Sequence, residues 1–414
     1  MPELVFLAHR IPYPPDKGDK IRSWNFLHHL AQRFDIRLGC FIDDPRDWDF
    51  TDKLREICSD CCFVKITPRL ARYASLRGLI DGRALTLPYY DHRELRQWTR
   101  DTLARPGVTH AFVYCSAMAQ YIEPAHRGRI RSIADIVDID SAKWDEYAQR
   151  ASLPMRWLYT REARALQETE REIATRFDAT IVATDAELEL LRGFAPEGGE
   201  RLACVHNGVD SDYFSPERAY DNPYTSADIP LVFVGAMDYW PNVDAVAHFA
   251  KTILPALRER LPAARFFIVG SNPPPEVIAL AAPDVTVTGR VPDVRPYVAH
   301  AAAVVAPLRV ARGVQNKVLE GMAMGKPVIG STEALTGITA EIGKEFLLAD
   351  TPEAFVDAIV LAATTEQGKI VGRQARLRMT ANYGWSRNLA RLDWLVDGPG
   401  DALRPLAASG TRST

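Results

Sequence analysis

The chain has 414 residues, of which 47% are hydrophobic, and a formal net charge of −3. This length allows two or three domains with cores of their own, and the charge gives no overall argument for nucleic-acid binding. No apolar run approaches the roughly 20 residues that span a bilayer, and the first residues lack the basic segment of a secretory signal. We therefore expect a cytoplasmic protein that binds no nucleic acid.

Three of the six cysteines, Cys58, Cys61 and Cys62, lie close together in the sequence. This spacing suits zinc or a redox pair, but no second close pair of cysteines or histidines completes a set of four ligands. The cysteine content fits a reducing compartment. We therefore expect reduced thiols and no bound metal.

The first half of the chain alternates short apolar segments with helical ones. An amphipathic helix is expected at 21–33, and a long charged helix with a solvent-facing surface at 157–177. Alternating strands and helices predict a parallel, doubly wound α/β sheet, whose ligands bind beyond the carboxyl ends of the strands. The expected strands are 4–8, 36–42, 63–66, 111–115, 133–137 and 180–183.

Two loops at these strand ends carry candidate site residues. In the loop 10–22, Gly18 would let the backbone pass close to a ligand and would open the next helix, although a plain turn explains it too. The segment 135–143 has three acidic residues at a strand end. Asp138 is the first candidate there and Asp140 the second; capping of the following helix by Asp140 or Ser141 is an equally good explanation.

Basic and apolar residues are interleaved between the two loops. Such a pattern can rest on anionic lipid headgroups, and ordinary amphipathic helices have the same pattern, so both interpretations stay open. The residues are Arg69, Arg72, Arg77, Arg83, Arg93, Arg96 and Arg100, among Leu70, Tyr73, Leu76, Leu79, Tyr89 and Tyr90.

The second half of the chain repeats the pattern after the segment 203–216, ACVHNGVDSDYFSP, in which Asn207-Gly208 predicts a turn. Strands are expected at 231–235, 266–270, 285–289, 303–307 and 328–330, each ending in Gly or Pro, as suits a Rossmann-type domain whose loops approach a nucleotide. Helices follow from Pro352 to Ala381, and the segment 385–396 is amphipathic. Residues 398–414 are rich in small and polar residues and are predicted to be disordered.

The segment 307–331, PLRVARGVQNKVLEGMAMGKPVIGS, combines a strand end, a cationic loop and a helix that starts at Asn316. The first N–H groups of a helix have no partner within it and the helix dipole is positive there, while Arg309 and Lys317 add full charges. This arrangement predicts a phosphate site. The alternative is that Lys317 and Glu320 form a solvated helix face.

With these segments, the chain resembles the nucleotide-sugar glycosyltransferases of family 4 (GT4), which have the two-Rossmann-domain GT-B fold. Among them it is similar to bacterial sugar transferases of PEP-CTERM/EpsH-type exopolysaccharide systems. The resemblance implies two doubly wound parallel-sheet domains that face each other across a cleft. They would be residues 1–206 on the acceptor side and 207–384 on the nucleotide-sugar side, with the helix 385–397 returning to the first domain before the tail 398–414.

The resemblance also implies roles for residues of the segment 307–331. Glu320 matches the second Glu of the family's Glu-x7-Glu pattern, which holds the donor ribose. The first Glu, which normally lies near the donor sugar, falls on Arg312. Arg312 is expected to bind the donor at this position, and the change of residue leaves the sugar specificity open. Gly313 and Val314, in the same loop, are expected to bind the donor.

Other loops would complete the donor site. Gly18 matches the glycine loop that faces the donor phosphates and the acceptor, and Asp138 would lie against the donor sugar. Arg290 is expected to reach the donor phosphates, and Val291 to contact the base through its backbone. Many members have Arg and Lys where this chain has Asp238 and Asn242, which leaves the diphosphate to Arg309 and Lys317.

The implied activity is transfer of a sugar from a nucleotide diphosphate sugar to a glycan or polyprenyl-linked acceptor, in exopolysaccharide or cell-surface polysaccharide synthesis. Asp138, Arg309 and Lys317 would be catalytic, with retention of anomeric configuration and no cofactor or metal. The protein would act in the cytoplasm, at the inner face of the cell membrane if it contacts anionic lipid. The alternatives are a UDP-sugar epimerase of the same fold, which needs no second substrate, and a non-catalytic nucleotide-sugar-binding subunit of a polysaccharide complex.

Overall fold

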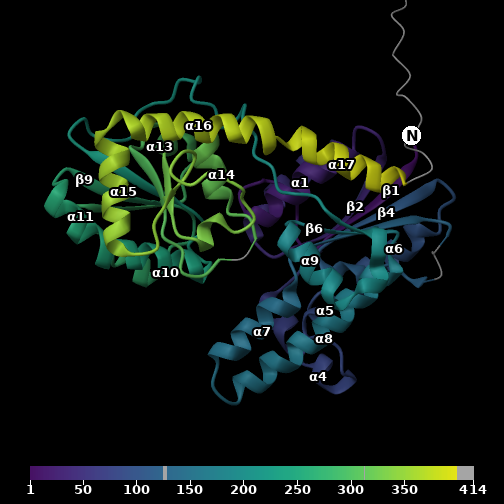
Figure 1. Cartoon of the computed structure of the whole chain (residues 1–414). Helices are drawn as coiled ribbons and strands as arrows, with labels where there is room; N and C mark the ends of the chain where they lie inside the picture. Colours follow the sequence, from purple (N-terminus) through teal and green to yellow (C-terminus); the bar gives the residue numbers. More distant parts are fainter. Residues whose placement is uncertain (125–127, 312, 399–414) are drawn as a thin grey trace, which may run out of the picture. The chain divides into compact units, whose positions relative to one another are not determined.

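The computed structural model describes residues 1–124, 128–311 and 313–398 (Figure 1). Its contacts divide the chain into two compact units. Unit 1 comprises Met1–Val182, Glu187–Val205 and the chain from Asn388; unit 2 comprises Ala183–Ala186 and His206–Arg387. Arg312 and the predicted disordered tail beyond Gly398 lie outside the described residues.

Unit 1 is built on a seven-stranded sheet of order β3-β2-β1-β4-β5-β6-β7, and all its strand pairs are parallel. The strands are near-continuous apolar runs because helices cover both faces of such a sheet. The strand order reverses between β1 and β4, which is where loops at the carboxyl ends open a crevice. The strands are β1 Glu3–Ala8, β2 Asp35–Ile42, β3 Asp60–Lys65, β4 Val108–Tyr114, β5 Arg131–Val137, β6 Ala179–Val182 and β7 Leu202–Cys204.

The helices of unit 1 include the long helix predicted near 157–177, but one face of that helix is buried and includes Glu162 and Glu170. The prediction of a helix is therefore confirmed, but the prediction that the helix faces solvent is wrong for its buried face. The helices are α1 Gly18–Leu30, α2 Thr51–Arg55, α3 Pro68–Ser75, α4 Arg77–Asp81, α5 Thr86–Tyr89, α6 Arg93–Leu103, α7 Asp140–Arg150, α8 Met155–Arg176 and α9 Asp185–Phe194. In the described ranges, none combines the length and the apolar composition needed to span a bilayer.

The last helix, α17 (Trp385–Asp397), belongs to unit 1 from Asn388 onward, where it lies near α1 in Figure 1. Its Asp393 Oδ1 lies 2.8 Å from His29 Nε2 and accepts a hydrogen bond from Arg33 Nη1. Arg131 Nε donates to the carbonyl of Leu395 at 3.1 Å. These polar contacts fix the returning helix, as the fold predicted from the sequence requires.

Unit 2 has a six-stranded parallel sheet of order β10-β9-β8-β11-β12-β13. The order reverses between β8 and β11, so the loops after these two strands meet at the same edge. The strands are β8 Ile229–Val234, β9 Ala264–Val269, β10 Val285–Gly289, β11 Ala303–Ala306, β12 Val328–Gly330 and β13 Leu347–Leu348. The main helices are α10 Trp240–His248, α11 Leu254–Arg260, α12 Pro275–Ile278, α13 Arg295–His300, α14 Asn316–Ala323, α15 Pro352–Thr364 and α16 Glu366–Asn382. The α/β fold of parallel sheets is thereby confirmed.

The predicted turn at Asn207-Gly208 is wrong. Gly208 does not adopt a positive φ, and the adjacent Val209 forms a parallel bridge with Gly384. A glycine is required there for a different reason, because a Cβ would lie 2.8 Å from the Trp385 ring and 3.0 Å from the carbonyl oxygen of Tyr383.

Glycines directly after β8 and β9 bring two backbones into contact at the reversal edge of unit 2. A Cβ on Gly270 would lie 1.7 Å from the carbonyl oxygen of Gly235. No side-chain movement can relieve this overlap, since the neighbour is backbone. The glycines at these strand ends therefore fix how closely the loops that follow can approach.

We expect Gly270→Ala to lower the free energy of unfolding by about 3 kcal/mol, because the added methyl must displace the strand end. Urea denaturation of both proteins measures the change. Gly193→Ala is the matched control, since a Cβ there meets nothing within 4 Å and alanine is favoured over glycine in a helix by up to about 1 kcal/mol. Equal stability of the two variants would contradict this packing.

Candidate functional site

The candidate site of unit 2 lies at the start of α14. The loop after β11 is anchored by Ser331, whose hydroxyl donates to the carbonyl of Leu308, and contains Gly313 at φ +65°. Gln315 precedes the helix without a capping bond from its side chain. The buried Oδ1 of Asn316 has no donor among the described residues. A helix start with an unsatisfied buried acceptor beside it is an arrangement that a bound ligand can complete.

Lys317 projects from the first turn of α14 onto the ring of Phe233, with Nζ 5.0 Å from the ring centre. Its ammonium donates to Asn242 Oδ1 at 3.1 Å and to Gln315 Oε1 at 3.3 Å. Within the described ranges no carboxylate forms an ion pair with it. Burial lowers the pKa of Lys317 to about 8, with Glu320 acting in the opposite direction. The site thus holds a half-buried cation that has no anionic partner among the described residues.

Glu320 lies one helical turn after Lys317, on the same face of α14. Burial raises the pKa of its carboxyl to about 7, and the charge of Lys317 only partly offsets this. In the part of the chain that the structure describes, no group donates a hydrogen bond to this carboxylate. Both side chains are half-buried, so Lys317 and Glu320 do not form a fully solvated helix face.

Arg309, the second predicted cation, is not a free charge. Its guanidinium makes a bidentate ion pair with Asp244 of α10, with Nε 2.9 Å from Oδ2, and its side chain is 58% exposed. The hydrogen bond with Asp244 raises the pKa of Arg309. Nothing in the sequence around Asp244 marks it as this partner, because α10 is separated from the loop by more than 60 residues.

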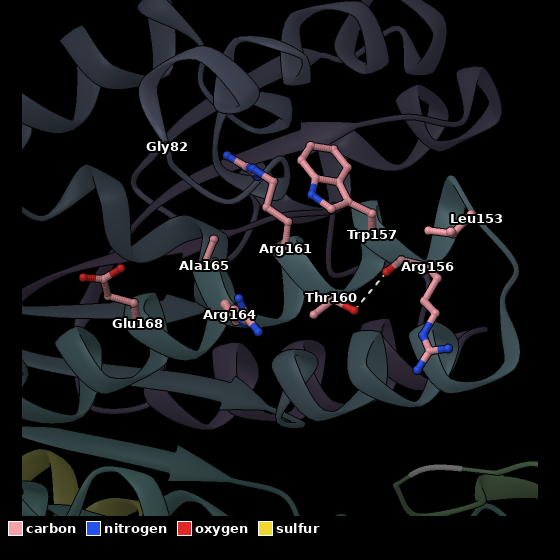
Figure 2. A pocket seen from close by; sticks show the side chains of 9 residues that line it. All are labelled: Gly82, Leu153, Arg156, Trp157, Thr160, Arg161, Arg164, Ala165 and Glu168. Atoms are coloured by element: carbon pink, nitrogen blue, oxygen red, sulfur yellow. Dashed lines mark hydrogen bonds between the residues drawn. The ribbon is translucent and has the colours of Figure 1, made fainter.

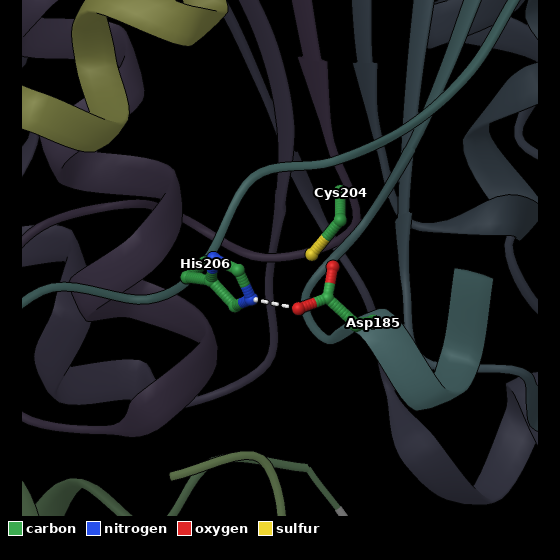
Figure 3. Close-up of side chains that lie close together, drawn as sticks. All are labelled: Asp185, Cys204 and His206. Atoms are coloured by element: carbon green, nitrogen blue, oxygen red, sulfur yellow. Dashed lines mark hydrogen bonds and ion pairs between the residues drawn. The ribbon is translucent and has the colours of Figure 1, made fainter. Parts of the chain in front are cut away.

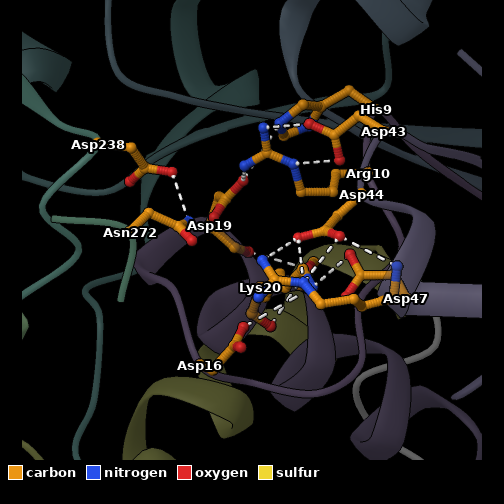
Figure 4. Close-up of polar contacts among 12 residues, drawn as sticks. His9, Arg10, Asp16, Asp19, Lys20, Asp43, Asp44, Asp47, Asp238 and Asn272 are labelled. Carbon is orange, nitrogen blue, oxygen red and sulfur yellow. Dashed lines mark hydrogen bonds and ion pairs between the residues drawn. The ribbon is translucent and has the colours of Figure 1, made fainter. Parts of the chain in front are cut away.

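The remaining predicted positions of unit 2 lie at the start of α10, on the loop before α14 and on other loops of the same unit. Asn242 is 5% exposed and also donates to the carbonyl of Ala236 at 2.8 Å, so it connects the loop after β8 to Lys317. Arg290 is exposed and follows Gly289, which has φ +68°. Val291 and Val314 pack partly against the core of unit 2. Asp238 accepts a hydrogen bond from Asn272 at 3.1 Å (Figure 4).

In unit 1, Gly18 is the first residue of α1, and a network of charges surrounds the loop before it (Figure 4). Arg10 lies 2.6 Å from Asp19 and 2.9 Å from Asp43. Although burial raises the pKa of Asp19, the hydrogen bond from His9 and the charge of Arg10 bring it below its ordinary value. His9, directly after β1, keeps a buried Nδ1 without a partner among the described residues. A histidine at a strand end was the signal by which the sequence could have indicated this network.

Asp138 follows β5 of unit 1 in a strained turn, because the preceding Val137 has φ +66°, which a β-branched residue rarely adopts. Burial raises the pKa of Asp138 to about 7, and the charges of Glu187 and Asp140 add to the effect. Its Oδ1 is buried without a donor in the described ranges. This carboxyl is thus able to hold a proton near neutral pH.

The alternative explanation of the acidic segment, that Asp140 or Ser141 caps the following helix, is wrong, because α7 begins at Asp140 and its N-cap position is Ile139. Ser141 donates through both its backbone and its hydroxyl to Glu170 of α8, and Glu187 accepts from the N–H of Ile139 at 2.7 Å. Carboxylates from outside the segment therefore satisfy the start of α7. The role of Asp138 at a donor sugar stays a prediction, as do the roles of Gly18, Arg290, Val291, Gly313 and Val314.

A further acid–base pair lies outside these sites. His206 Nε2 is 3.1 Å from Asp185 Oδ2, and both residues belong to unit 2 (Figure 3). The carboxylate is mostly exposed, so solvent screens the interaction and its contribution to stability is small.

Two doubly wound parallel sheets in separate units define the class of this protein: it has the GT-B fold of glycosyltransferases. Residues 229–364, which include most of the candidate site of unit 2, match the family model of glycosyl transferases group 1. The match supports the resemblance to glycosyltransferases as a group, without distinguishing the PEP-CTERM/EpsH-type enzymes among them.

One curated relative and several solved structures are similar to the chain. A D-inositol 3-phosphate glycosyltransferase from Corynebacterium urealyticum is 25% identical over 257 residues, which span 56% of this chain and 59% of that protein. A sucrose-phosphate synthase from Thermosynechococcus elongatus has a TM-score of 0.69 at 18% identity, and the match covers 95% of this chain and 98% of the synthase chain. Anabaena HepE in complex with UDP has a TM-score of 0.63 at 14% identity, and the match covers 94% of this chain and 98% of that chain. At these identities the two structures support the fold alone.

We expect Lys317→Met to make the ligand-free protein more stable at pH 7, by up to about 3 kcal/mol. Burial lowers the pKa of Lys317 from 10.5 to about 8, so the penalty for the buried charge is full below pH 8. The penalty shrinks as the pH rises, because the folded state then binds fewer protons than the unfolded state. The difference in melting temperature between variant and wild type should therefore be larger at pH 7 than at pH 10.

Lys344→Met is the control for this comparison, since Lys344 is 54% exposed and pairs with Glu341. It should leave the melting temperature nearly unchanged at both pH values. A Lys317→Met variant that is less stable than wild type at pH 7 would contradict an unrelieved buried charge.

Proposed function

We propose that this protein is a glycosyltransferase that uses a nucleotide diphosphate sugar as donor. One observation carries the proposal: at the start of α14 the desolvated ammonium of Lys317 has no anionic partner within the described ranges, and the carboxylate of Glu320 has no donor there. A nucleotide diphosphate supplies the missing groups, an anion for Lys317 and ribose hydroxyls for Glu320. The group 1 match over this region and the structural neighbours, which include HepE with UDP and with UDP-glucose, support the assignment.

The proposed contacts follow from the chemistry of each group. The diphosphate would accept hydrogen bonds from the Lys317 ammonium and from the N–H groups of Asn316 and Lys317, to which no acceptor is assigned in the described structure. The next two N–H groups of α14, those of Val318 and Leu319, already donate to the carbonyl of Gln315. The backbones of Gly313 and Val314 would line the same loop, and Val291 would contact the base. Arg309 would contribute after exchanging Asp244 for a phosphate oxygen, and Arg290 is exposed and able to reach an anion.

In the transfer step, the bond between the anomeric carbon and the diphosphate breaks while an acceptor hydroxyl forms a new bond to that carbon. Negative charge develops on the leaving diphosphate, and fixed donors that stabilise it lower the barrier. Removing one such donor typically costs about 3 kcal/mol, or about a hundredfold in rate. Lys317 and the helix N-terminus would supply this stabilisation without a metal ion. Asp138, together with Gly18 at the start of α1, would act on the sugar and acceptor side.

The biological setting is part of the proposal. The resemblance to PEP-CTERM/EpsH-type transferases favours a glycan or polyprenyl-linked acceptor in exopolysaccharide or cell-surface polysaccharide synthesis, with retention of configuration, in the cytoplasm and at a membrane surface. The curated relative and WaaG, which is involved in lipopolysaccharide biosynthesis, support sugar transfer in general.

We expect a panel of UDP-, GDP- and dTDP-sugars to contain one donor that raises the melting temperature. A ligand at about 100 times its dissociation constant adds about 2.7 kcal/mol of stability, which corresponds to roughly 5 °C or more. Lys317→Met should abolish this shift although the unliganded variant is folded, because the methionine keeps the packing on Phe233 and removes the charge together with its hydrogen bonds to Asn242 and Gln315.

The control is again Lys344→Met, which should keep the full shift. An unchanged nucleotide affinity in Lys317→Met would show that the diphosphate binds elsewhere. Turnover separates the rival functions: an epimerase converts the donor without an acceptor, a binding subunit shows the shift with no turnover, and a transferase consumes donor only when a hydroxyl acceptor is present.

Binding of the nucleotide sugar should be tightest between about pH 7 and pH 8. Above pH 8, Lys317 loses the proton that the diphosphate requires, so the affinity falls as the pH rises. Below pH 7, Glu320 becomes protonated and loses an acceptor for the ribose hydroxyls, so the affinity falls as the pH decreases. Calorimetric titrations from pH 5.5 to 8.5 measure the profile, because neither the diphosphate diester nor the base of the nucleotide sugar titrates in this range.

Two variants identify the residue that causes the decrease in affinity on each side of this pH profile. Lys317→Met should remove the decrease on the alkaline side, and Glu320→Gln the decrease on the acid side. A wild-type profile that is flat, or an alkaline decrease that persists in Lys317→Met, would assign the titration to other groups.

A further inference from the structure

Exposed apolar side chains gather on one part of unit 1, formed by α3, α4 and the start of α8. We call this surface the α3–α4–α8 face. Of the eighteen large hydrophobic side chains that are exposed in the described residues, eight lie here. Six of them expose half or more of their surface: Leu70 68%, Tyr73 74%, Leu76 50%, Ile80 90%, Leu153 77% and Trp157 61%. Surfaces of soluble proteins rarely gather apolar groups in this way without a partner.

The face is held together by buried polar contacts, so it is a formed surface and not a loose segment. Arg161 of α8 donates through Nη2 to the carbonyls of Gly78, in α4, and Arg83. The buried carboxylate of Glu162 accepts hydrogen bonds from the N–H groups of Leu85 and Thr86, at 2.8 and 3.2 Å. The start of α8 thus fixes α4 and the turn that follows it.

A groove runs between this turn and α8 (Figure 2). Gly82 lies on one side. On the other lie Leu153, just before α8, and the α8 residues Arg156, Trp157 and Arg164. The hydroxyl of Thr160 is already bonded to the carbonyl of Arg156. One carboxylate, Glu168, also lines the groove, against three arginines, Arg156, Arg161 and Arg164. The groove therefore offers an apolar wall and an excess of guanidinium groups to a ligand that is both anionic and apolar.

The charge of the face is opposite to that of the whole chain. Residues 67–83 and 150–168 contain eight arginines and three carboxylates, whereas the chain has a net charge of −3. One of the carboxylates, Glu162, is buried and turned inward. The structure assigns no carboxylate partner among the described residues to Arg69, Arg72, Arg77, Arg156 or Arg164, although many exposed arginines elsewhere are paired, such as Arg171 with Glu197.

We propose that the α3–α4–α8 face docks on an anionic lipid bilayer, with its apolar side chains at the level of the headgroups. Tryptophan and tyrosine suit this region because they are apolar bodies with a polar tip. Arginine stems lie along apolar surface while the guanidinium groups reach lipid phosphates, and basic residues near an anionic surface are attracted to it. The inference does not depend on the donor site, which belongs to unit 2.

A second copy of the chain is a poor occupant of this face. A two-fold dimer brings the same patch of both subunits together, so the unpaired arginines of one copy would meet those of the other. The combination of exposed isoleucine, leucine and tryptophan with unpaired arginines is complementary to a bilayer that contains acidic lipids.

Sedimentation of the full-length protein with lipid vesicles tests the proposal. Vesicles of phosphatidylcholine with one third phosphatidylglycerol should bind the protein at least about tenfold more tightly than phosphatidylcholine alone, and added salt should weaken the binding. Ile80→Asp, and Arg69→Ser together with Arg72→Ser, should each weaken it by about tenfold or more. All of these side chains are exposed, so the melting temperature should not change.

Matched controls are Leu377→Asp, which replaces an apolar residue 60% exposed on α16, and Arg260→Ser with Arg373→Ser, both exposed in unit 2. They should bind vesicles like wild type. Equal binding to both kinds of vesicle, no binding, or equal losses in the control variants would overturn the proposal. So would a wild-type dimer in solution that Ile80→Asp converts to a monomer, because the face would then be a protein interface. Nucleotide thermal shifts of the same variants report on unit 2 separately.

Discussion

The desolvated ammonium of Lys317, one helical turn from the carboxyl of Glu320, is the interaction on which the proposed donor site depends. Burial disfavours both charges: it lowers the pKa of the lysine to about 8 and raises that of the glutamate to about 7. Near neutral pH, therefore, both groups reduce the stability of the ligand-free chain. A fold retains such an arrangement where a ligand restores the missing interactions, and titratable groups shifted in this way are typical of functional sites.

The fold positions this pair through backbone constraints. The strand order of unit 2 reverses between β8 and β11, so the start of α10, which carries Asn242, and the helix that carries Lys317 meet at one edge. The close approach of Gly270 to Gly235 fixes the strand ends nearby. In unit 1 the strand order reverses between β1 and β4, and there the ion pair of Arg10 with Asp19 fixes the loop after β1. The buried ion pair of Arg22 with Asp135, at 2.7 Å, supports the sheet beneath this loop.

The sequence predicts the strands well because parallel strands covered on both faces are continuous apolar runs, as in β1 and β11. It misses β7 and β13, which have three and two residues, too few for a pattern to be distinguished from a loop. The error at Gly208 has another cause: a glycine that avoids contact with Trp385 has the same sequence signature as a glycine in a turn. Long-range pairs leave no local signal, so neither the capture of Arg309 by Asp244 nor the contact of Asn242 with Lys317 could be read from the chain. The phosphate-site pattern itself was readable, since strand, loop and helix start are contiguous.

The most direct test of the central claim is a crystal structure of the protein with the nucleotide sugar that gives the largest thermal shift. The account predicts the diphosphate within hydrogen-bond distance of Lys317 Nζ and of N–H groups in the first turn of α14, with the ribose hydroxyls on Glu320. A nucleotide bound elsewhere, while Lys317 still donates to Asn242 and Glu320 contacts no ligand, would contradict it.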